Sequence, residues 1–177
     1  VHSRPLPVNY GDRGVTGFYG AGDGTLRAVD TSTGRERWAF IAKEHYPKFQ
    51  RQKDNSPAVA FPGLVTSPAP QPKDYFFDGG IGLFQDAGNS RVWIYPSQRR
   101  GGRMLYGFDV TTPESPQLMW RVGCPRPAPD DTGCTAGLSA LGQTWSQPTV
   151  VRLKGYPSAG AETPLVLVGG GYDTCED

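Results

Sequence analysis

The stretch GDGTLRAVDTSTGRERWAF, residues 22–40, decides the fold, because a related stretch, GGRMLYGFDVTTPESPQLMWRV, occupies residues 101–122. Each copy starts with a glycine-rich turn, continues as a short apolar run that ends in aspartate, and closes with a strand that carries tryptophan. The aspartates and tryptophans of the two copies are Asp30, Asp109, Trp38 and Trp120. A unit that recurs with its turn and its aromatic side chain in place is one structural module used twice.

Strand signals continue on both sides of the two copies. Aromatic and β-branched residues alternate with turns rich in Gly, Asp and Ser, which is the pattern of short antiparallel strands joined by tight turns. We predict three strands in residues 14–42, four strands in residues 75–123, and the first two strands of another sheet in residues 144–173. No long helix is predicted.

Successive antiparallel meanders favour an all-β fold, a β-propeller in which each small sheet is one blade. The blades are expected at residues 14–42, 75–123 and 144–173 onward, within one partial propeller domain over residues 1–177. A single sheet cannot bury both of its faces, so it stacks on its neighbours, and the recurring tryptophan is predicted to lie between adjacent blades. The predicted interblade docking residues are Asp30, Gly34, Trp38, Asp109 and Trp120.

Residues 43–74 differ from the strands around them, because they are charged and rich in proline. We predict a surface insertion, in which Pro47 breaks any helical turn and His45 is solvated. Arg99 and Arg100 precede two glycines and are predicted to form the tip of a hairpin.

Composition excludes several classes of protein. A net charge of +1 over 177 residues gives no reason to expect nucleic acid as a partner. No apolar run approaches the roughly 18 residues of a membrane span, so no membrane-spanning segment is predicted. The chain begins VHSRPLP, without methionine, and ends just past a predicted strand, and we therefore expect an internal piece of a longer protein.

The cysteines favour a disulfide. Cys124 and Cys134 flank the Pro-rich stretch CPRPAPDDTGC, a loop that offers no core in which to bury a thiol. A structural disulfide between them would place the chain in an oxidising compartment, with Cys175 left for a partner elsewhere. The alternatives are three reduced thiols in a cytosolic protein, or a zinc site, which the absence of CxxC and of nearby histidines disfavours. Asp130 and Asp131 within the loop are interpreted as solubilising residues.

The first copy resembles the tryptophan-docking motif of quinoprotein-like propellers, A-x-D-x-x-T-G-x-x-x-W, from Ala28 to Trp38. A longer resemblance covers most of the chain: VHSRPLPVNYG, the first copy, YFFDGG, the second copy, LGQTWSQPTVVRL and LVLVGGGYDTCED occur in the order typical of the C-terminal propeller of the PilY/PilC family. Proteins of this family are associated with type IV pili of Gram-negative bacteria.

The resemblance implies an exported, non-enzymatic protein of the periplasm, outer membrane or cell surface, acting at the pilus tip. It implies roles in pilus assembly, control of retraction and surface adhesion, with minor pilin subunits and host or abiotic surfaces as partners. The family also has a calcium-binding loop of the type D-x-D-x-D, which this sequence lacks. Asp173, Glu176 and Asp177 form only a loose acidic cluster, so calcium is expected outside this fragment, and no metal, cofactor or catalytic residue is assigned here.

Two other functions remain open. The first is a pyrroloquinoline-quinone-dependent dehydrogenase, because the docking motif is shared with such enzymes. That chemistry needs a quinone pocket, a bound Ca²⁺ and an aspartate base, often with adjacent cysteines, and the sequence contains no Cys-Cys pair. The second is a generic propeller scaffold that binds proteins through its loops, for which residues 43–74 and 124–143 are the candidate surfaces.

Overall fold

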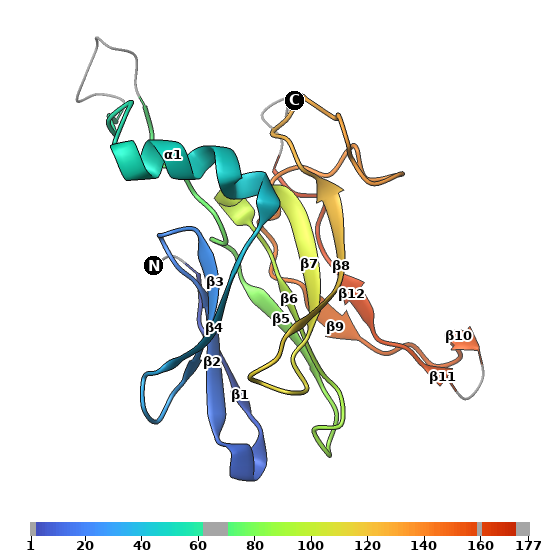
Figure 1. The fold of residues 1–177 in the computed structure, drawn as a ribbon. Helices are drawn as coiled ribbons and strands as arrows, with labels where there is room; N and C mark the ends of the chain where they lie inside the picture. The colour runs from blue at the N-terminus through green and yellow to red at the C-terminus, as the bar shows by residue number, and fades with distance from the viewer. Residues whose placement is uncertain (1–2, 62–70, 159–160, 173–177) are drawn as a thin grey trace.

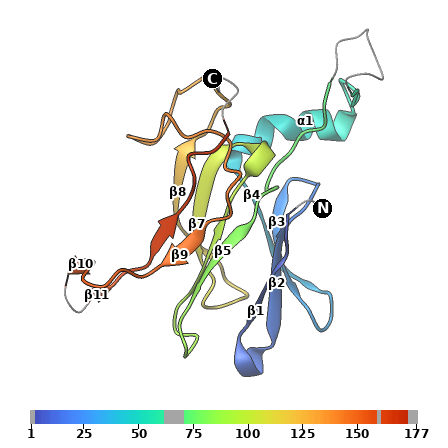
Figure 2. The ribbon, with the colours of Figure 1, turned by 180° about the vertical axis from the view of Figure 1, so that it is seen from behind.

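The computed structural model describes residues 3–61, 71–158 and 161–172, and antiparallel sheets dominate this part of the chain (Figure 1). Two four-stranded sheets, each with its strands in sequence order, are followed by a pair of short strands and a small hairpin. The view from behind in Figure 2 shows the same arrangement, with the first two sheets next to each other and the third pair beyond the second sheet.

The first sheet has four strands, one more than the sequence pattern predicted. The added strand is an edge strand whose alternation is short and interrupted by Pro7, which explains why it gave no clear signal. A short 3₁₀-helix, η1 (Gly11–Arg13), connects the first two strands. The strands are β1 (Leu6–Asn9), β2 (Val15–Gly20), β3 (Thr25–Asp30) and β4 (Glu36–Ile41).

The second sheet has the four strands that the sequence predicted, but residues 75–80 precede the first of them. The predicted hairpin tip at Arg99 and Arg100 lies in the connection between the second and third strands of this sheet, where it forms a 3₁₀-helix, η3 (Arg99–Gly101). This segment packs tightly, because a Cβ atom on Gly101 would lie 1.7 Å from the carbonyl oxygen of Phe76. The strands are β5 (Ile81–Gln85), β6 (Val92–Pro96), β7 (Arg103–Asp109) and β8 (Gln117–Cys124).

The two sequence copies have the same strand register. Trp38 pairs with Ala28 across β3 and β4, and Trp120 pairs with Gly107 across β7 and β8. In both sheets the register shifts directly after the paired small residue. The module recognised in the sequence is therefore one backbone unit, including its irregularity.

The third group of strands is shorter than predicted. β9 (Thr149–Val151) pairs with β12 (Leu165–Leu167), and the segment between them contains a hairpin of β10 (Pro157–Ser158) and β11 (Ala161–Glu162). The predicted strand end at residue 173, the acidic cluster and Cys175 lie outside the described residues.

Two predictions about the insertion after β4, residues 43–74, are wrong. Pro47 does not break a helix: it occupies the first turn of α1 (Tyr46–Asp54), where its missing N–H costs nothing. His45, predicted to be solvated, ends the 3₁₀-helix η2 (Lys43–His45) and is only 1% exposed. No helix in the described parts of the chain is long and apolar enough to cross a membrane.

The main core lies between the first two sheets. Phe40 of β4 packs edge-on against Phe108 of β7, with ring centroids 4.9 Å apart, and also contacts Tyr106 and Phe77. Apolar burial across the two sheets is therefore what holds them together. The largest fully buried side chains in this core are Phe18, Leu26, Ile94, Tyr106 and Phe108.

Candidate functional site

Trp38 lies where the first sheet meets the second. Its ring packs against Phe18 of its own sheet and against Phe108 of the next sheet, with centroids 5.7 and 6.3 Å away. Its indole N–H donates a 2.9 Å hydrogen bond to the carbonyl oxygen of Pro113, in the turn between β7 and β8. The structure thus brings this predicted docking residue into contact with both sheets.

Asp30 organises the turn that precedes Trp38. One carboxylate oxygen accepts hydrogen bonds from the backbone N–H and hydroxyl of Ser32 and from the N–H of Thr33, and these bonds lower the pKa of Asp30 to about 2. Gly34 closes the turn with φ of 71°, a left-handed conformation that favours glycine, and its N–H donates to the carbonyl of Asp30.

Polar bonds extend this contact between the sheets. Arg37 binds the second carboxylate oxygen of Asp30 at 2.7 Å and also pairs with Glu114 in the β7–β8 turn. Tyr10, which is 3% exposed, donates from its hydroxyl to the carbonyl of Val110 at 2.8 Å. Because the Arg37–Glu114 and Tyr10–Val110 bonds link the two sheets, the docking residues act as part of a fixed interface.

The second copy makes different contacts within the described residues. Asp109 accepts hydrogen bonds from the N–H of Thr111 and from the indole of Trp93, so it orders its own sheet. Trp120 stacks on Tyr95 with centroids 5.6 Å apart and covers Gly107, where a Cβ atom would lie 2.4 Å from the indole ring. The contacts observed for Asp109 and Trp120 are therefore within one sheet.

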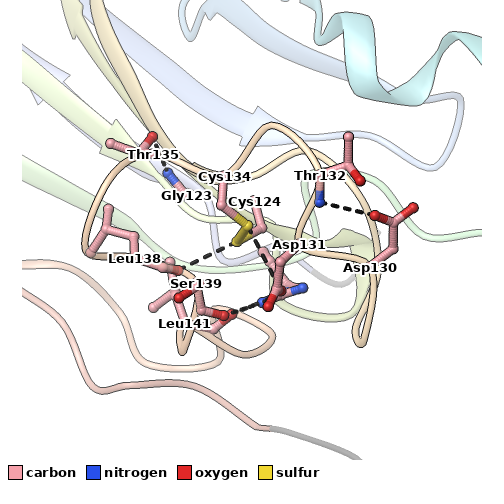
Figure 3. The surroundings of a disulfide bond; sticks show 11 residues. Gly123, Cys124, Asp130, Asp131, Thr132, Cys134, Thr135, Leu138, Ser139 and Leu141 are labelled. Atoms are coloured by element: carbon pink, nitrogen blue, oxygen red, sulfur yellow. Dashed lines mark hydrogen bonds and ion pairs between the residues drawn. A yellow bond between two sulfur atoms is a disulfide. The ribbon is translucent and has the colours of Figure 1, made fainter.

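The loop after β8 is closed by a disulfide between Cys124 and Cys134 (Figure 3). The backbone around the disulfide is held to the sheet, because Gly123 and Thr135 exchange two hydrogen bonds. In the described part of the chain, one group of potential metal ligands is close together, formed by the two cysteines and Asp131. Both sulfur atoms are used in the disulfide, so this group lacks the thiolates that a zinc site requires.

Asp131 has a structural role that the sequence interpretation missed. It is not only a solubilising residue, because it pairs at 2.9 Å with Arg103, a β7 side chain that is 4% exposed. The same guanidinium donates to the carbonyl oxygens of Leu141 and Ser139 on the segment beyond the loop. Figure 3 shows Asp131, Ser139 and Leu141 close together below the disulfide. The disulfide loop is thereby tied to a buried cation of the second sheet.

Removing the disulfide is expected to destabilise the chain. Replacing both Cys124 and Cys134 with serine should lower the free energy of unfolding by about 2–3 kcal/mol, because the open chain regains the loop-closure entropy. Denaturant unfolding of the two forms measures the difference. Free thiols at Cys124 and Cys134 in protein purified without reductant, or equal stability of the two forms, would contradict a structural disulfide.

A second buried network was not visible in the sequence. Glu44 of η2, whose side chain is 5% exposed, accepts a hydrogen bond from the hydroxyl of Tyr106 and pairs with Arg121. Burial and the bond to Glu44 raise the pKa of Tyr106. Glu44 is more than 60 positions from Tyr106 and from Arg121, so no local pattern could have joined it to them.

Comparison with known proteins gives relatives of one kind. No family model matches the chain. The type IV pilus biogenesis factor PilY1 of Pseudomonas aeruginosa is 28% identical over 160 residues, which are 90% of this chain and 12% of PilY1. A PilY1 homolog of Xylella fastidiosa is 28% identical over 163 residues, 90% of this chain and 11% of the homolog. The crystal structure of the P. aeruginosa PilY1 C-terminal domain matches with a TM-score of 0.51 and 26% identity, over 90% of this chain and 25% of that one.

The predicted resemblance to the PilY/PilC family is confirmed. The propeller-like, all-β fold expected from the sequence is confirmed by the same match to the PilY1 C-terminal domain. The chain spans only about an eighth of the length of the PilY1 proteins that it matches. These curated relatives are named for pilus biogenesis, and none is named for a reaction.

Proposed function

We propose that this chain is part of the C-terminal propeller of a type IV pilus biogenesis factor and acts there as a non-enzymatic structural module. The observation that carries the proposal is the match to PilY1 over 90% of the chain in both sequence and structure. The contacts between the first two sheets support a rigid scaffold, since Trp38, Tyr10 and Arg37 all connect one sheet to the other.

The ends of the sheets supply candidate surfaces for partners. Helix α1 and the disulfide loop lie at the same end of the two main sheets in both views (Figures 1 and 2). Tyr46 and Phe61 of the insertion are 61% and 47% exposed. Loops on a rigid scaffold commonly carry recognition. We propose that this end contacts minor pilin subunits, and that adhesion to host or abiotic surfaces and control of retraction depend on the same propeller.

The proposed location is outside the cytoplasm, at the pilus tip or cell surface of a Gram-negative bacterium. The disulfide supports an oxidising compartment, because such bonds persist there. The calcium site that the family resemblance implies is proposed to lie in another part of the propeller, with no cofactor held by these residues.

A chimera tests the function directly. In P. aeruginosa lacking PilY1, we expect surface pili and twitching motility to return when PilY1 carries this chain in place of its matching segment. The same chimera with Trp38→Ala should lose most of this activity, because the contact between the sheets is removed. Electron microscopy and sheared-pilin immunoblots measure the pili, and host-cell binding at equal piliation separates adhesion from assembly.

The outcome that would contradict the proposal is a chimera that is exported at the normal level but leaves the cells without pili. Dye-linked alcohol oxidation by the full chain with quinone and Ca²⁺ would instead support the dehydrogenase.

A further inference from the structure

A cavity of about 260 Å³ lies between the insertion and the disulfide loop. Glu44, His45 and Lys48 form one side of the cavity, and residues 124–128 of the disulfide loop form another. Gln98 and residues 100–103 supply a further part of the lining. Gln143 and Tyr172 complete the lining, so the cavity joins segments that are far apart in the sequence. Its volume suits a small molecule, since pockets for larger organic ligands are typically about 300–1,000 Å³.

Cationic side chains outnumber carboxylates in the lining of the cavity. Its ionisable lining contains one carboxylate, Glu44, which is already engaged by Tyr106 and Arg121. Four cationic side chains also line it: Lys48, Arg100, Arg103 and Arg126. Arg100 and Arg126 are paired with Asp78 and Asp130, which are not among the lining residues. Arg103 is paired with Asp131 in the same way, so Lys48 is the lining cation that has no ion pair with a carboxylate among the described residues.

Lys48 is the lining cation whose charge is least balanced by neighbouring groups. Its ammonium donates to the carbonyl oxygens of Tyr75 and Gly101, each at 2.8 Å, and both partners are neutral. Burial lowers the pKa of Lys48, and the charge of Asp74 opposes this effect only in part. A partly buried cation without a carboxylate hydrogen bond gains strongly from a nearby anion.

Arg103 adds a donor that remains unused. Its Nε and Nη2 atoms bind Leu141, Ser139 and Asp131, but Nη1 is buried and has no hydrogen-bond partner among the described residues. A buried donor left unpaired is costly, so an acceptor that reaches it is favoured. Arg103 is 4% exposed and held on three sides, which keeps its guanidinium fixed.

We propose that this cavity binds a small oxyanion, a carboxylate or a phosphate, with Lys48 as its principal charge and Arg103 and Arg126 as further donors. The disulfide holds the wall formed by residues 124–128, so the site depends on the oxidised loop. The ligand is an acceptor-rich group of few atoms, because the available volume is small and the donors are ammonium and guanidinium groups.

Calorimetric titration of the full chain tests the site. Inorganic phosphate and succinate are added separately at constant ionic strength, with chloride as the background anion. We expect saturable binding of at least one of them, with a Kd of about 1 mM or lower. The ligand that binds more tightly distinguishes a phosphate from a carboxylate site.

Matched variants test whether the anion binds in this cavity. Lys48→Met should weaken the affinity by about tenfold or more, because a charge-assisted bond is lost. Lys53→Met, on the exposed side of the same helix, should leave it unchanged. If Lys48→Met fails to fold, Arg126→Gln serves instead, since the Arg126 side chain is 59% exposed, and it should weaken binding severalfold. Absence of saturable binding by both anions, or binding unaffected by the Lys48 or Arg126 substitution, would overturn the proposal.

Discussion

Replacing Trp38 with alanine is expected to lower the free energy of unfolding by about 3–5 kcal/mol. The indole packs between Phe18 and Phe108, which belong to different sheets, and it donates to the carbonyl of Pro113. Alanine removes the ring from this contact, leaves a void between the sheets and leaves the carbonyl without its donor. Because the lost contacts lie at the interface between the sheets, the unfolding of the two sheets should also become less cooperative.

Denaturant unfolding followed by circular dichroism measures this effect. Trp38→Phe should lose only about 1–2 kcal/mol, because it keeps most of the aromatic surface and loses the hydrogen bond. Trp145→Ala is the matched control: this tryptophan is 42% exposed and its ring contacts Arg99 and Tyr172, so about 1 kcal/mol is expected. Equal losses at Trp38 and Trp145 would show that Trp38 does not hold the sheets together.

The repeat could be recognised from the sequence because the residues that define it lie close together in the chain. Asp30, Gly34 and Trp38 lie within nine residues, and turn chemistry, strand alternation and the aromatic position all indicate the same unit. The second sheet was predicted for the same reason, down to its four strands. By contrast, β1 is short and contains Pro7, so its pairing with β2 is decided by the neighbouring strand and not by its own sequence.

The insertion could not be predicted because its structure is decided by distant contacts. A charged segment with a proline looks like a loop when it is read alone. In the structure Lys48 reaches the backbone of Tyr75 and Gly101, and Glu44 binds Tyr106 and Arg121. The polar residues that suggested solvent exposure are therefore the ones that attach the insertion to the sheets.

His45 is expected to make the stability of the protein fall by about 3 kcal/mol between pH 7 and pH 4. Burial, with a contribution from the nearby Lys48 charge, lowers the pKa of His45 from 6.5 to about 3, while the Gly101 backbone partly opposes this shift. The imidazole packs edge-on against Phe76 and Phe77 and lies 3.1 Å from the amide nitrogen of Gln98. The folded chain therefore requires the neutral form.

The direction of this pH dependence follows from the pKa of His45, which is about 6.5 in the unfolded chain and about 3 in the folded chain. Above pH 6.5 the histidine is neutral in both the folded and the unfolded chain, so its contribution is fully present. As the pH falls below 6.5, the unfolded chain binds a proton that the folded chain does not accept until about pH 3, and stability is lost over this window. Carboxylates such as Asp30, whose pKa is also lowered, add to the loss at the acidic end.

Comparison of two substitutions isolates the contribution of His45. The chain has two histidines, so His45→Gln should flatten the pH dependence of unfolding, while His2→Gln should leave it unchanged. The orientation of Gln98 supports this reasoning: its carbonyl oxygen accepts from the N–H of Met104, so its amide N–H₂ donates to an unprotonated imidazole nitrogen. If His45→Gln does not fold, NMR titration gives the answer directly. An imidazole signal from His45 that titrates near its ordinary pKa of about 6.5 would show that the charged form is tolerated in the core.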